Sequence, residues 1–209
     1  MLGVQHYLQS GKTLEDLTTD LSIKVTYHPT LPLVILNYDQ IDSPKTDRIV
    51  RECRGLTLDT QNFYLVSRSF SRFFNVGEVA DEMPLFDFSE FIVQSKEDGS
   101  LVSIYHYDGE WRANTRGSFA QDLLQFQTFT WQEAFLKALN VGSLNDLNLN
   151  PELTYTCEFC SVWNKVVRKY STPSMFLLTA FKGEDELSWE EVDALPEARS
   201  FLRPKVYYF

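Results

Sequence analysis

Short apolar or alternating segments, bounded by turn residues, dominate the chain between residues 30 and 181 and predict β-strands. The predicted strands span residues 33–38, 55–58, 63–70, 91–95, 101–107, 110–115, 155–159 and 175–181. Asp108 and Gly109 form the two-residue link that favours a tight hairpin between two of these strands. Strands joined in this way predict antiparallel meanders, because parallel neighbours need a long crossover connection.

Helical patterns occur at both ends of the chain and in one segment between strands. The predicted helices span residues 3–9, 14–21, 119–140 with a break near 128–130, and a short segment between Ser188 and Pro196. Thr13 and Asp16 have the spacing of a helix N-terminus, and Ser188 and Glu191 have the spacing of a capping box. Helices inserted between strand meanders predict an α+β fold.

A single domain is expected, because 209 residues with a 44% hydrophobic content can form one substantial core. The 16 Phe, 10 Tyr and 4 Trp are typical of an ordered globular protein. Within residues 1–209 we expect a small helical cover over 1–25, a core over 26–181 and an acidic C-terminal segment over 182–209. That last segment holds seven acids and no base between residues 184 and 197.

The net charge of −10 excludes a protein that coats nucleic acid through a broad basic surface. The charge is uneven, however, because Lys165, Arg168 and Lys169 form a basic run without an acid between them. An acidic body with a local basic site suits an enzyme that holds a triphosphate better than a coat protein.

Neither a membrane segment nor a centre built on Cys and His is expected. The apolar runs at 31–36 and 175–181 are much shorter than the ~18 residues that cross a bilayer. The N-terminus lacks the pattern of a secretory signal, so a cytoplasmic location follows by default. Cys157 and Cys160 have a C-x-x-C spacing, but in a predicted strand residues three apart point to opposite faces and cannot chelate together.

Lys96 carries the main chemical signal. It ends a predicted strand, and Asp98 and Gly99 then make a tight turn that lets a phosphate or a base approach the backbone. Attack of a lysine on the α-phosphate of a nucleotide needs the neutral amine, whereas a free lysine with a pKa of about 10.4 is mostly protonated at neutral pH. Partial burial of the side chain and nearby cations both favour the neutral amine, and the cations also bind phosphate. Alone, this segment is more typical of a solvated surface turn.

Basic side chains that suit such a site lie at other predicted strand ends and turns. Arg54, Arg72 and Arg116 can each contact phosphate. Glu158 lies in a predicted strand, and its carboxylate can accept hydrogen bonds from ribose hydroxyls.

Three other candidates are given ordinary structural interpretations. Arg68 is interpreted as a solvated strand residue rather than a phosphate contact. Phe73 and Phe74 are interpreted as core residues rather than a platform for base stacking, because apolar pairs at strand ends usually pack.

Five short motifs, in order along the chain, resemble the phage tRNA-repair RNA ligase family. They are Glu-Cys-Arg-Gly-Leu at 52–56, Arg-Phe-Phe-Asn at 72–75, Lys-Glu-Asp-Gly-Ser-Leu at 96–101, Thr-Arg-Gly-Ser at 115–118 and Glu-Phe-Cys at 158–160. The resemblance covers roughly residues 30–181 and implies the adenylylation domain of the covalent nucleotidyltransferases. Ordered matches of this kind make a coincidental surface turn the weaker interpretation of Lys96.

The resemblance also implies roles for individual residues. It implies that Lys96 becomes adenylylated, that Arg54 and Arg72 contact the ATP phosphates and that Glu158 contacts the ribose. Arg116 is implied as a nearby basic contact, and Tyr38 is similar to the nucleotide-contacting tyrosine of the family. We assign no metal ligands.

The implied activity is ATP-dependent joining of an RNA 5′-phosphate to a 3′-hydroxyl, with Mg²⁺ as the metal and RNA repair as the setting. Transfer RNA is a candidate substrate, and no membrane partner is expected. The basic run at 165, 168 and 169 is either part of the RNA-facing surface or a solvated edge, and the sequence leaves both interpretations open.

The sequence departs from the family pattern in two motifs. No Glu is followed directly by Gly, and no two Lys are separated by one residue, whereas the family uses a Glu-Gly motif near the metal and a Lys-x-Lys pair at the α-phosphate. We therefore expect a domain that is C-terminally incomplete relative to the family. It is a piece of a longer ligase, a chain completed by a second polypeptide, or a remnant.

Two alternative functions stay open at this point. One is a catalytically impaired module that binds nucleotides or RNA ends, which the two missing motifs favour. The other is mRNA capping or DNA ligation through the same lysine chemistry, which is weaker because the segments at 54–55 and 72–75 resemble RNA ligases.

Overall fold

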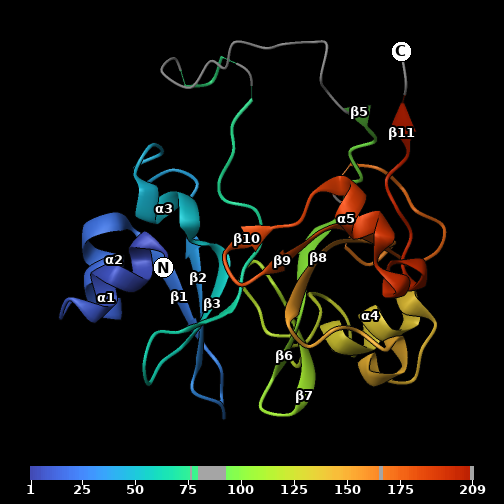
Figure 1. Ribbon diagram of the computed structural model, residues 1–209, viewed down its shortest axis with the longest axis horizontal. Coiled ribbons are helices and arrows are strands. Elements are labelled where there is room, and N and C mark those ends of the chain that lie inside the picture. The colour runs from blue at the N-terminus through green and yellow to red at the C-terminus, as the bar shows by residue number, and fades with distance from the viewer. Residues whose placement is uncertain (76, 80–92, 165–166, 208–209) are drawn as a thin grey trace.

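The computed structural model describes residues 1–75, 77–79, 93–164 and 167–207. Two antiparallel sheets form two halves of the molecule, and helices lie on their outer sides (Figure 1). The strands are β1 (Ile23–Tyr27), β2 (Leu33–Tyr38), β3 (Arg54–Asp59), β4 (Leu65–Ser67), β5 (Val93–Gln94), β6 (Ser100–Tyr107), β7 (Glu110–Thr115), β8 (Leu153–Cys160), β9 (Ser174–Lys182), β10 (Asp185–Glu186) and β11 (Val206–Tyr207). The helices are α1 (Gly3–Gln9), α2 (Leu14–Leu21), α3 (Arg48–Glu52), α4 (Trp131–Leu139) and α5 (Trp189–Ala194), with short 3₁₀ helices at Leu144–Leu147 and Pro196–Ser200. The predicted α+β class is confirmed.

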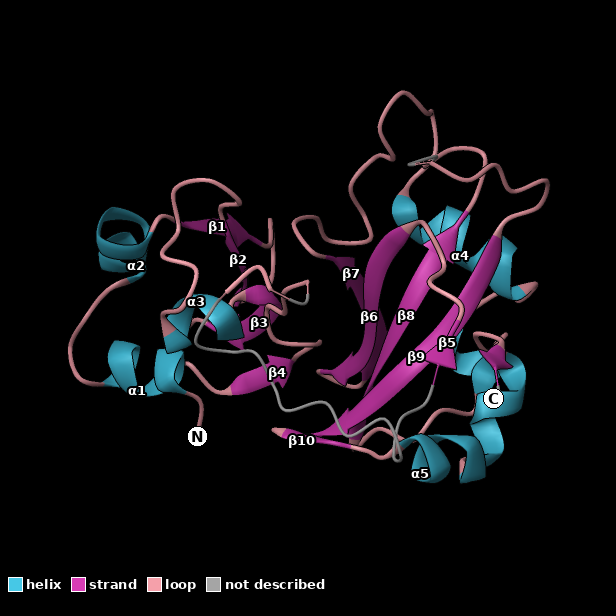
Figure 2. Ribbon diagram, turned by 90° about the horizontal axis from the view of Figure 1, so that it is seen from above, coloured by secondary structure: helices cyan, strands magenta, loops and turns pink. Residues whose placement is uncertain are grey.

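The first sheet has the strand order β1, β2, β3, β4, and each neighbouring pair is antiparallel. Residues Leu33–Leu36 of strand β2 are all apolar and buried, which fits a strand whose two faces are both covered by other parts of the chain. Val34 and Leu36 pack in the cluster beneath α1 and α2, whereas Leu33 and Ile35 pack with Phe119 on the opposite face. Figure 2 shows α1 and α2 on the side that faces away from the second sheet.

The second sheet has the strand order β10, β9, β8, β6, β7 and forms the larger core. Helix α4 lies against its outer side (Figure 2), and the ring of Phe135 on this helix packs 5.2 Å from that of Phe159 on β8, centroid to centroid. The predicted hairpin between β6 and β7 is confirmed. Its two turn residues, Asp108 and Gly109, have φ angles of 52° and 76°, as a two-residue type I′ turn requires.

The segment after β9 also contributes to this core. Val192, Ala198 and Phe201 are buried in the same cluster as the second sheet. Strand β11 then pairs with β5 as a small third sheet. The division of the chain into a core over 26–181 and a separate segment over 182–209 stays a prediction.

The predicted helix over 119–140 is wrong in its first half, because only α4 is helical there. Thr130 is the N-cap of α4, and its hydroxyl accepts a hydrogen bond from the backbone N–H of Glu133 while the Glu133 carboxylate accepts from the N–H of Thr130. This capping box starts a helix at Trp131 and excludes one that continues through it. The preceding apolar residues instead pack from turns, as Phe119 and Leu124 do.

Other predicted elements match with smaller differences. Helices α1 and α2 have the predicted bounds, and α5 begins after Ser188 as its capping box predicts. The predicted strand at 63–70 shrinks to β4, since Phe63 adopts a φ of 57° that no strand residue has. Residues 91–92 of another predicted strand lie outside the described residues. The sequence patterns missed β1, α3, β10 and β11.

None of the described helices is long and apolar enough to cross a membrane. Cys157 and Cys160 are free and buried in β8, as expected for structural residues, and Cys53 is likewise free and buried. Within the described ranges no group of three or more His, Cys, Asp or Glu could hold a metal ion by itself.

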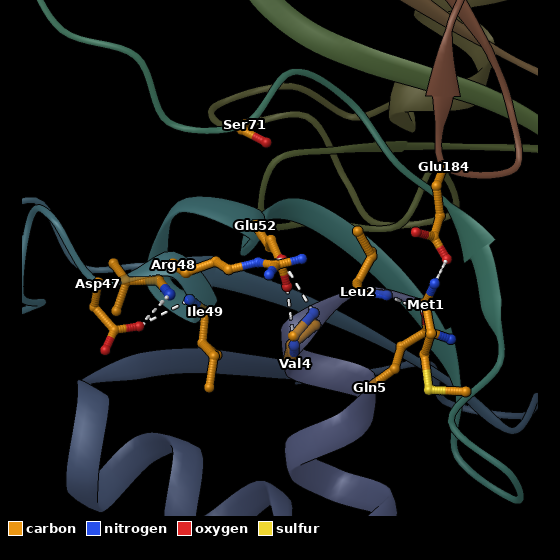
Figure 3. Close-up of polar contacts among 12 residues, drawn as sticks. Met1, Leu2, Val4, Gln5, Asp47, Arg48, Ile49, Glu52, Ser71 and Glu184 are labelled. Atoms are coloured by element: carbon orange, nitrogen blue, oxygen red, sulfur yellow. Dashed lines mark hydrogen bonds and ion pairs between the residues drawn. The ribbon is translucent and has the colours of Figure 1, made fainter. Parts of the chain in front are cut away.

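A buried carboxylate joins the N-terminal cover to the first sheet (Figure 3). The two oxygens of Glu52, the last residue of α3, accept hydrogen bonds from the backbone N–H groups of Gly3 and Val4 at 3.0 and 2.9 Å. These are donors that a helix leaves without an internal partner at its N-terminus. Arg48 donates to the same carboxylate at 3.1 Å. Because Arg54 follows two residues later, this contact also fixes where β3 begins.

We expect Glu52→Ala to lower the free energy of unfolding by about 1–3 kcal/mol, because two backbone donors of α1 lose a buried acceptor. Chemical denaturation followed by circular dichroism measures the change. Glu15→Ala is the matched control, since Glu15 is an exposed acid in the first turn of α2. Equal effects of the two substitutions would show that the Glu52 contact does not contribute to the free energy of unfolding beyond what an exposed acid does.

Candidate active site

A cavity of about 620 Å³ is lined by strand ends and turns that are far apart in the sequence. Arg54 comes from the start of β3, Arg116 follows β7, and Glu158 lies near the end of β8. Lys96 lines the same cavity from the turn between β5 and β6. The structure therefore brings four of the six predicted site residues around one cavity.

The backbone just before Lys96 is anchored by the C-terminal part of the chain. Ser95 donates its backbone N–H to the carbonyl of Lys205 at 2.8 Å, and its hydroxyl accepts a hydrogen bond from the N–H of Lys205 at 3.0 Å. The β5–β11 pair continues this ladder. The side chain of Lys96 itself is exposed, so the partial burial expected for it is wrong. The frame holds the backbone on either side and leaves the amine accessible.

The backbone just after Lys96 is anchored by residues 167–170. Asp98 accepts backbone hydrogen bonds from Val167 and Arg168 at 2.6 and 2.7 Å, and these bonds lower the pKa of its carboxyl. The hydroxyl of Tyr170 accepts the N–H of Asp98 at 2.9 Å and donates to the Glu97 carboxylate at 3.0 Å. Sequence reasoning missed Tyr170, because no local pattern ties it to a turn more than seventy residues earlier.

Glu97 links the two anchors to each other. One oxygen of its carboxylate accepts a hydrogen bond from the Ser95 hydroxyl at 2.7 Å. The other oxygen accepts hydrogen bonds from the Tyr170 hydroxyl at 3.0 Å and from the Arg168 guanidinium at 3.3 Å. The residues on both sides of Lys96 therefore share one buried carboxylate.

Gly99 packs directly against the end of β8. A Cβ at this position would lie 2.0 Å from the carbonyl oxygen of Phe159, much closer than any van der Waals contact allows. The N–H of Gly99 donates to Glu158 at 2.9 Å. Only glycine lets the turn that carries Lys96 lie directly on the end of β8, and this places Lys96 and Glu158 on the same cavity.

The carboxyl of Glu158 is in a mixed electrostatic environment. Burial raises its pKa, while the Gly99 hydrogen bond and the charges of Lys96 and Arg54 lower it and offset part of that rise. A carboxylate held in this way by cations is suited to accept hydrogen bonds from hydroxyl groups of a ligand.

Arg54 and Arg116 are brought together by Gly55. This glycine has a φ of 73°, and a Cβ on it would lie 3.0 Å from the Cα of Arg116. The guanidinium of Arg54 lies 4.6 Å from the ring centroid of Phe73. Burial, more than the nearby charge of Arg116, lowers the pKa of Arg54. Among the described residues its buried Nη1 atom has no hydrogen-bond partner.

Arg72 and Tyr38 lie behind the cavity rather than on it. They are only 4% and 6% exposed, and the Arg72 guanidinium packs 4.2 Å from the ring centroid of Tyr38. Arg116 lies on the same ring at 5.3 Å. The buried Nη1 of Arg72 also lacks a hydrogen-bond partner within the described part of the chain. The structure thus places Arg72 and Tyr38 next to the cavity-lining arginines without assigning them a ligand contact.

Two interpretations of individual residues are corrected by the structure. Phe73 is 64% exposed and lines the cavity, so it is not a core residue; its cation–π contact with Arg54 holds it at the surface. Phe74 is half-buried, 5.5 Å from Arg72. Arg68 is not solvated, because its guanidinium donates to the carbonyl of Glu184 at 2.7 Å and lies on the ring of Phe181. It ties the two sheets together.

The basic run predicted from the sequence is only partly described. Arg168 and Lys169 are exposed, whereas Lys165 lies outside the described residues. Arg168 borders the turn that carries Lys96 through its contact with Glu97.

The donor set fits a nucleoside triphosphate. Arg54 lines the cavity with the accessible Lys96, and Arg72 packs behind it. Each guanidinium keeps a buried nitrogen without a hydrogen-bond partner among the described residues, and such groups bind phosphate oxygens well. Mg²⁺ usually takes only one or two carboxylates and completes its shell with substrate phosphates and water, so the lack of a preformed cluster in the described residues does not conflict with a phosphate-bound ion.

The fold is that of the nucleotidyltransferase domain of ATP-dependent ligases. The structure is similar to an archaeal ATP-dependent RNA ligase, with a TM-score of 0.60 and 16% identity, over 98% of this chain and 53% of that one. It is also similar to a protein of Aquifex aeolicus with the provisional name ATP-dependent DNA ligase, with a TM-score of 0.56 and 19% identity, over 92% of this chain and 48% of that one.

A family model described as RNA ligase matches residues 52–201, and the chain belongs to this RNA ligase family. A relative from Autographa californica nuclear polyhedrosis virus is 32% identical over 200 residues, which are 88% of this chain and 29% of the relative. Its provisional name is bifunctional polynucleotide kinase/RNA ligase. A provisional RNA ligase of Thermovibrio ammonificans is 28% identical over 119 residues, 56% of this chain and 29% of that protein. The chain thus spans less than a third of the length of these relatives.

We expect Gly99→Ala to destabilise the protein by about 3 kcal/mol or more, since the new methyl group must push β6 away from the Phe159 carbonyl. Thermal and chemical denaturation measure this cost. Gly117→Ala is the control within another motif, because a Cβ there meets no atom within 4 Å. A Gly99→Ala protein as stable as Gly117→Ala would contradict the close packing of the Lys96 turn.

Proposed function

We propose that the chain is the adenylylation domain of an ATP-dependent RNA ligase and that Lys96 is its nucleophile. The observation that carries the proposal is the exposed Lys96 side chain on a cavity that Arg54, Arg116 and Glu158 also line. Covalent nucleotidyl transfer needs an accessible amine and nearby cations that can bind phosphate. The chain belongs to an RNA ligase family, and within the described residues Lys96, Arg54 and Arg116 line one cavity without an ion pair to a carboxylate.

The proposed reaction has three steps. The neutral amine of Lys96 attacks the α-phosphorus of ATP, a nitrogen–phosphorus bond forms, the bond to pyrophosphate breaks and the amine loses a proton to solvent. The 5′-phosphate of an RNA end then attacks the same phosphorus and releases the lysine. Finally a 3′-hydroxyl attacks the activated 5′-phosphate, and AMP leaves as the RNA strand is sealed.

The surrounding residues have separate roles in this proposal. Arg54 and Arg116 stabilise the negative charge that builds up on the phosphates during transfer, and Arg72 supports them from behind. Glu158 accepts hydrogen bonds from the ribose. Tyr38, which lies under two guanidinium groups, orients them. A bound Mg²⁺ supplies further charge neutralisation on the phosphates.

The biological setting belongs to the same proposal. RNA repair in the cytoplasm, with tRNA among the substrates, is the setting that the motif resemblance implies. We also propose that a further domain or a second chain supplies the Glu-Gly and Lys-x-Lys groups, which are absent from this sequence.

The absence of these two motifs favours an alternative, a module that binds ATP or RNA ends without transferring AMP. Losing one charged donor of this kind typically costs ~3 kcal/mol of transition-state stabilisation, about two orders of magnitude in rate. Intact-protein mass spectrometry after incubation with ATP and Mg²⁺ separates the two functions, because only the enzyme gains the mass of AMP. Parallel incubation with GTP tests capping chemistry.

We expect ATP labelled at its α-phosphate to mark the wild-type protein and to leave Lys96→Ala unmarked, because no other lysine among the described residues lines the cavity. Gel autoradiography gives the measurement, and peptide mapping locates the adduct. Lys12→Ala is the control, since Lys12 is an exposed lysine of the N-terminal cover. Labelling of Lys96→Ala at the wild-type level would refute the assignment.

We expect Arg54→Ala to slow labelling by about a hundredfold, because a buried guanidinium donor at the phosphates is lost. Arg54→Lys should recover only part of the rate, since an ammonium keeps the charge and loses the two-pronged donor geometry. The rate of AMP incorporation at saturating ATP is measured for each protein. Arg199→Ala, at an exposed position, serves as the control, and a rate for Arg54→Ala equal to this control would contradict the phosphate role.

A further inference from the structure

The connection between β7 and α4 begins and ends at the cavity, because Arg116 and Trp131 both line it. Residues 123–130 form a small hairpin within this connection. Leu123 and Thr130 form an antiparallel bridge, and the N–H of Leu124 donates to the carbonyl of Phe129 at 3.0 Å. The connection that carries this hairpin therefore starts and ends at the candidate active site.

Phe126 lies at the tip of this hairpin in an unfavourable state. It is 93% exposed, and its φ of 61° lies in the left-handed region that a bulky residue rarely adopts. Both the exposure of the ring and the backbone conformation cost free energy, and such outliers concentrate where a ligand or a partner is engaged. Packing against the described part of the chain does not account for a phenylalanine here.

The surroundings of the hairpin combine aromatic and cationic groups. The ring of Phe129 packs edge to face on that of Trp163 at 5.0 Å, and the ammonium of Lys137 lies 5.1 Å from the same indole. Trp163 belongs to the segment that also carries the exposed Arg168 and Lys169. This segment reaches the turn of Lys96 through its hydrogen bonds to Asp98.

Acidic groups near this surface are already engaged. The carboxylate of Asp122 accepts the N–H of Phe119 at 3.0 Å, and that of Glu133 caps α4. The exposed ring of Phe126, with the exposed cations Arg168 and Lys169 on a neighbouring segment, matches a single nucleic-acid strand, whose bases stack on aromatic faces while its phosphates meet cations. A second copy of this chain suits the surface less well, because each copy carries a net charge of −10.

We propose that the 123–130 hairpin is a base-stacking finger, on which Phe126 stacks with a base of the single-stranded RNA end that enters the cavity. The choice of RNA rests on the proposed function, whereas the stacking itself rests on Phe126 and its surroundings. Arg168 and Lys169 contact the phosphates of the same strand. The finger holds the strand and takes no part in the transfer of AMP.

Fluorescence anisotropy of the full chain, without ATP, tests the proposal with an unstructured, 5′-phosphorylated oligoribonucleotide of about ten nucleotides, within the usual site size for single strands. We expect Phe126→Ala to weaken binding by about tenfold, since one base loses its stacking partner. Phe126→Tyr keeps an aromatic face and should bind like the wild type. Ile41→Ala removes another exposed apolar side chain, 87% exposed on the N-terminal half, and should have no effect.

Three outcomes would refute the stacking role of Phe126. The wild-type chain could fail to bind the RNA, Phe126→Ala could bind it as tightly as Ile41→Ala, or Phe126→Tyr could bind it as weakly as Phe126→Ala. A change from dimer to monomer in Phe126→Ala on a sizing column, with RNA affinity unchanged, would assign the surface to a second copy of the chain instead.

Labelling with α-labelled ATP separates this proposal from the proposed function. Phe126→Ala should be labelled at Lys96 as fast as the wild type. If RNA binding depends on Phe126 but the chain never takes up AMP, the proposed ligase activity is refuted and the stacking role of Phe126 is supported. If labelling is normal but RNA binding does not depend on Phe126, the stacking role is refuted and the ligase activity is supported.

Discussion

The close approach of Gly99 to the carbonyl of Phe159 is the constraint on which the candidate site depends. It lies where β6 begins and β8 ends, so it fixes the turn of Lys96 against the strand that carries Glu158. The hydrogen bond from Gly99 to Glu158 then orients the carboxylate at the same point. A side chain at position 99 would push the turn of Lys96 away from Glu158, so the arrangement of the candidate site depends on a glycine at this position.

Around this contact the backbone is held from two directions while the lysine amine stays accessible. Ser95 is bonded to Lys205 near the end of the described chain, and Asp98 and Glu97 are bonded to residues 167–170. In the proposed reaction, a lysine whose backbone is positioned in advance loses little entropy when the nucleotide binds. The frame draws on segments distant in sequence, and residues after β9 also pack into the core of the second sheet.

Much of the fold could be predicted, because its strands and capped helices are local patterns. The Asp108-Gly109 turn and the Thr13 and Ser188 caps are decided by a few neighbouring residues. The segment at 119–130 was mispredicted because its apolar residues have helical spacing but pack from turns. The motifs located Lys96, Arg54, Arg116 and Glu158 on one cavity. The role of Tyr170 as a brace, and the exposure of Phe73, depend on tertiary contacts that no local pattern contains.

The partners of the buried arginines in this acidic protein support a phosphate ligand. Arg68 donates hydrogen bonds to the Glu184 carbonyl and the Ser71 hydroxyl, as a structural arginine does. Arg54 and Arg72 instead lie on the rings of Phe73 and Tyr38, and each keeps a buried Nη1 without a hydrogen-bond partner in the described residues. An aromatic face offsets part of the cost of burying a cation without consuming its N–H groups. A carboxylate in the same place would compete with phosphate, so contacts with rings are what keep these donors available inside a chain of net charge −10.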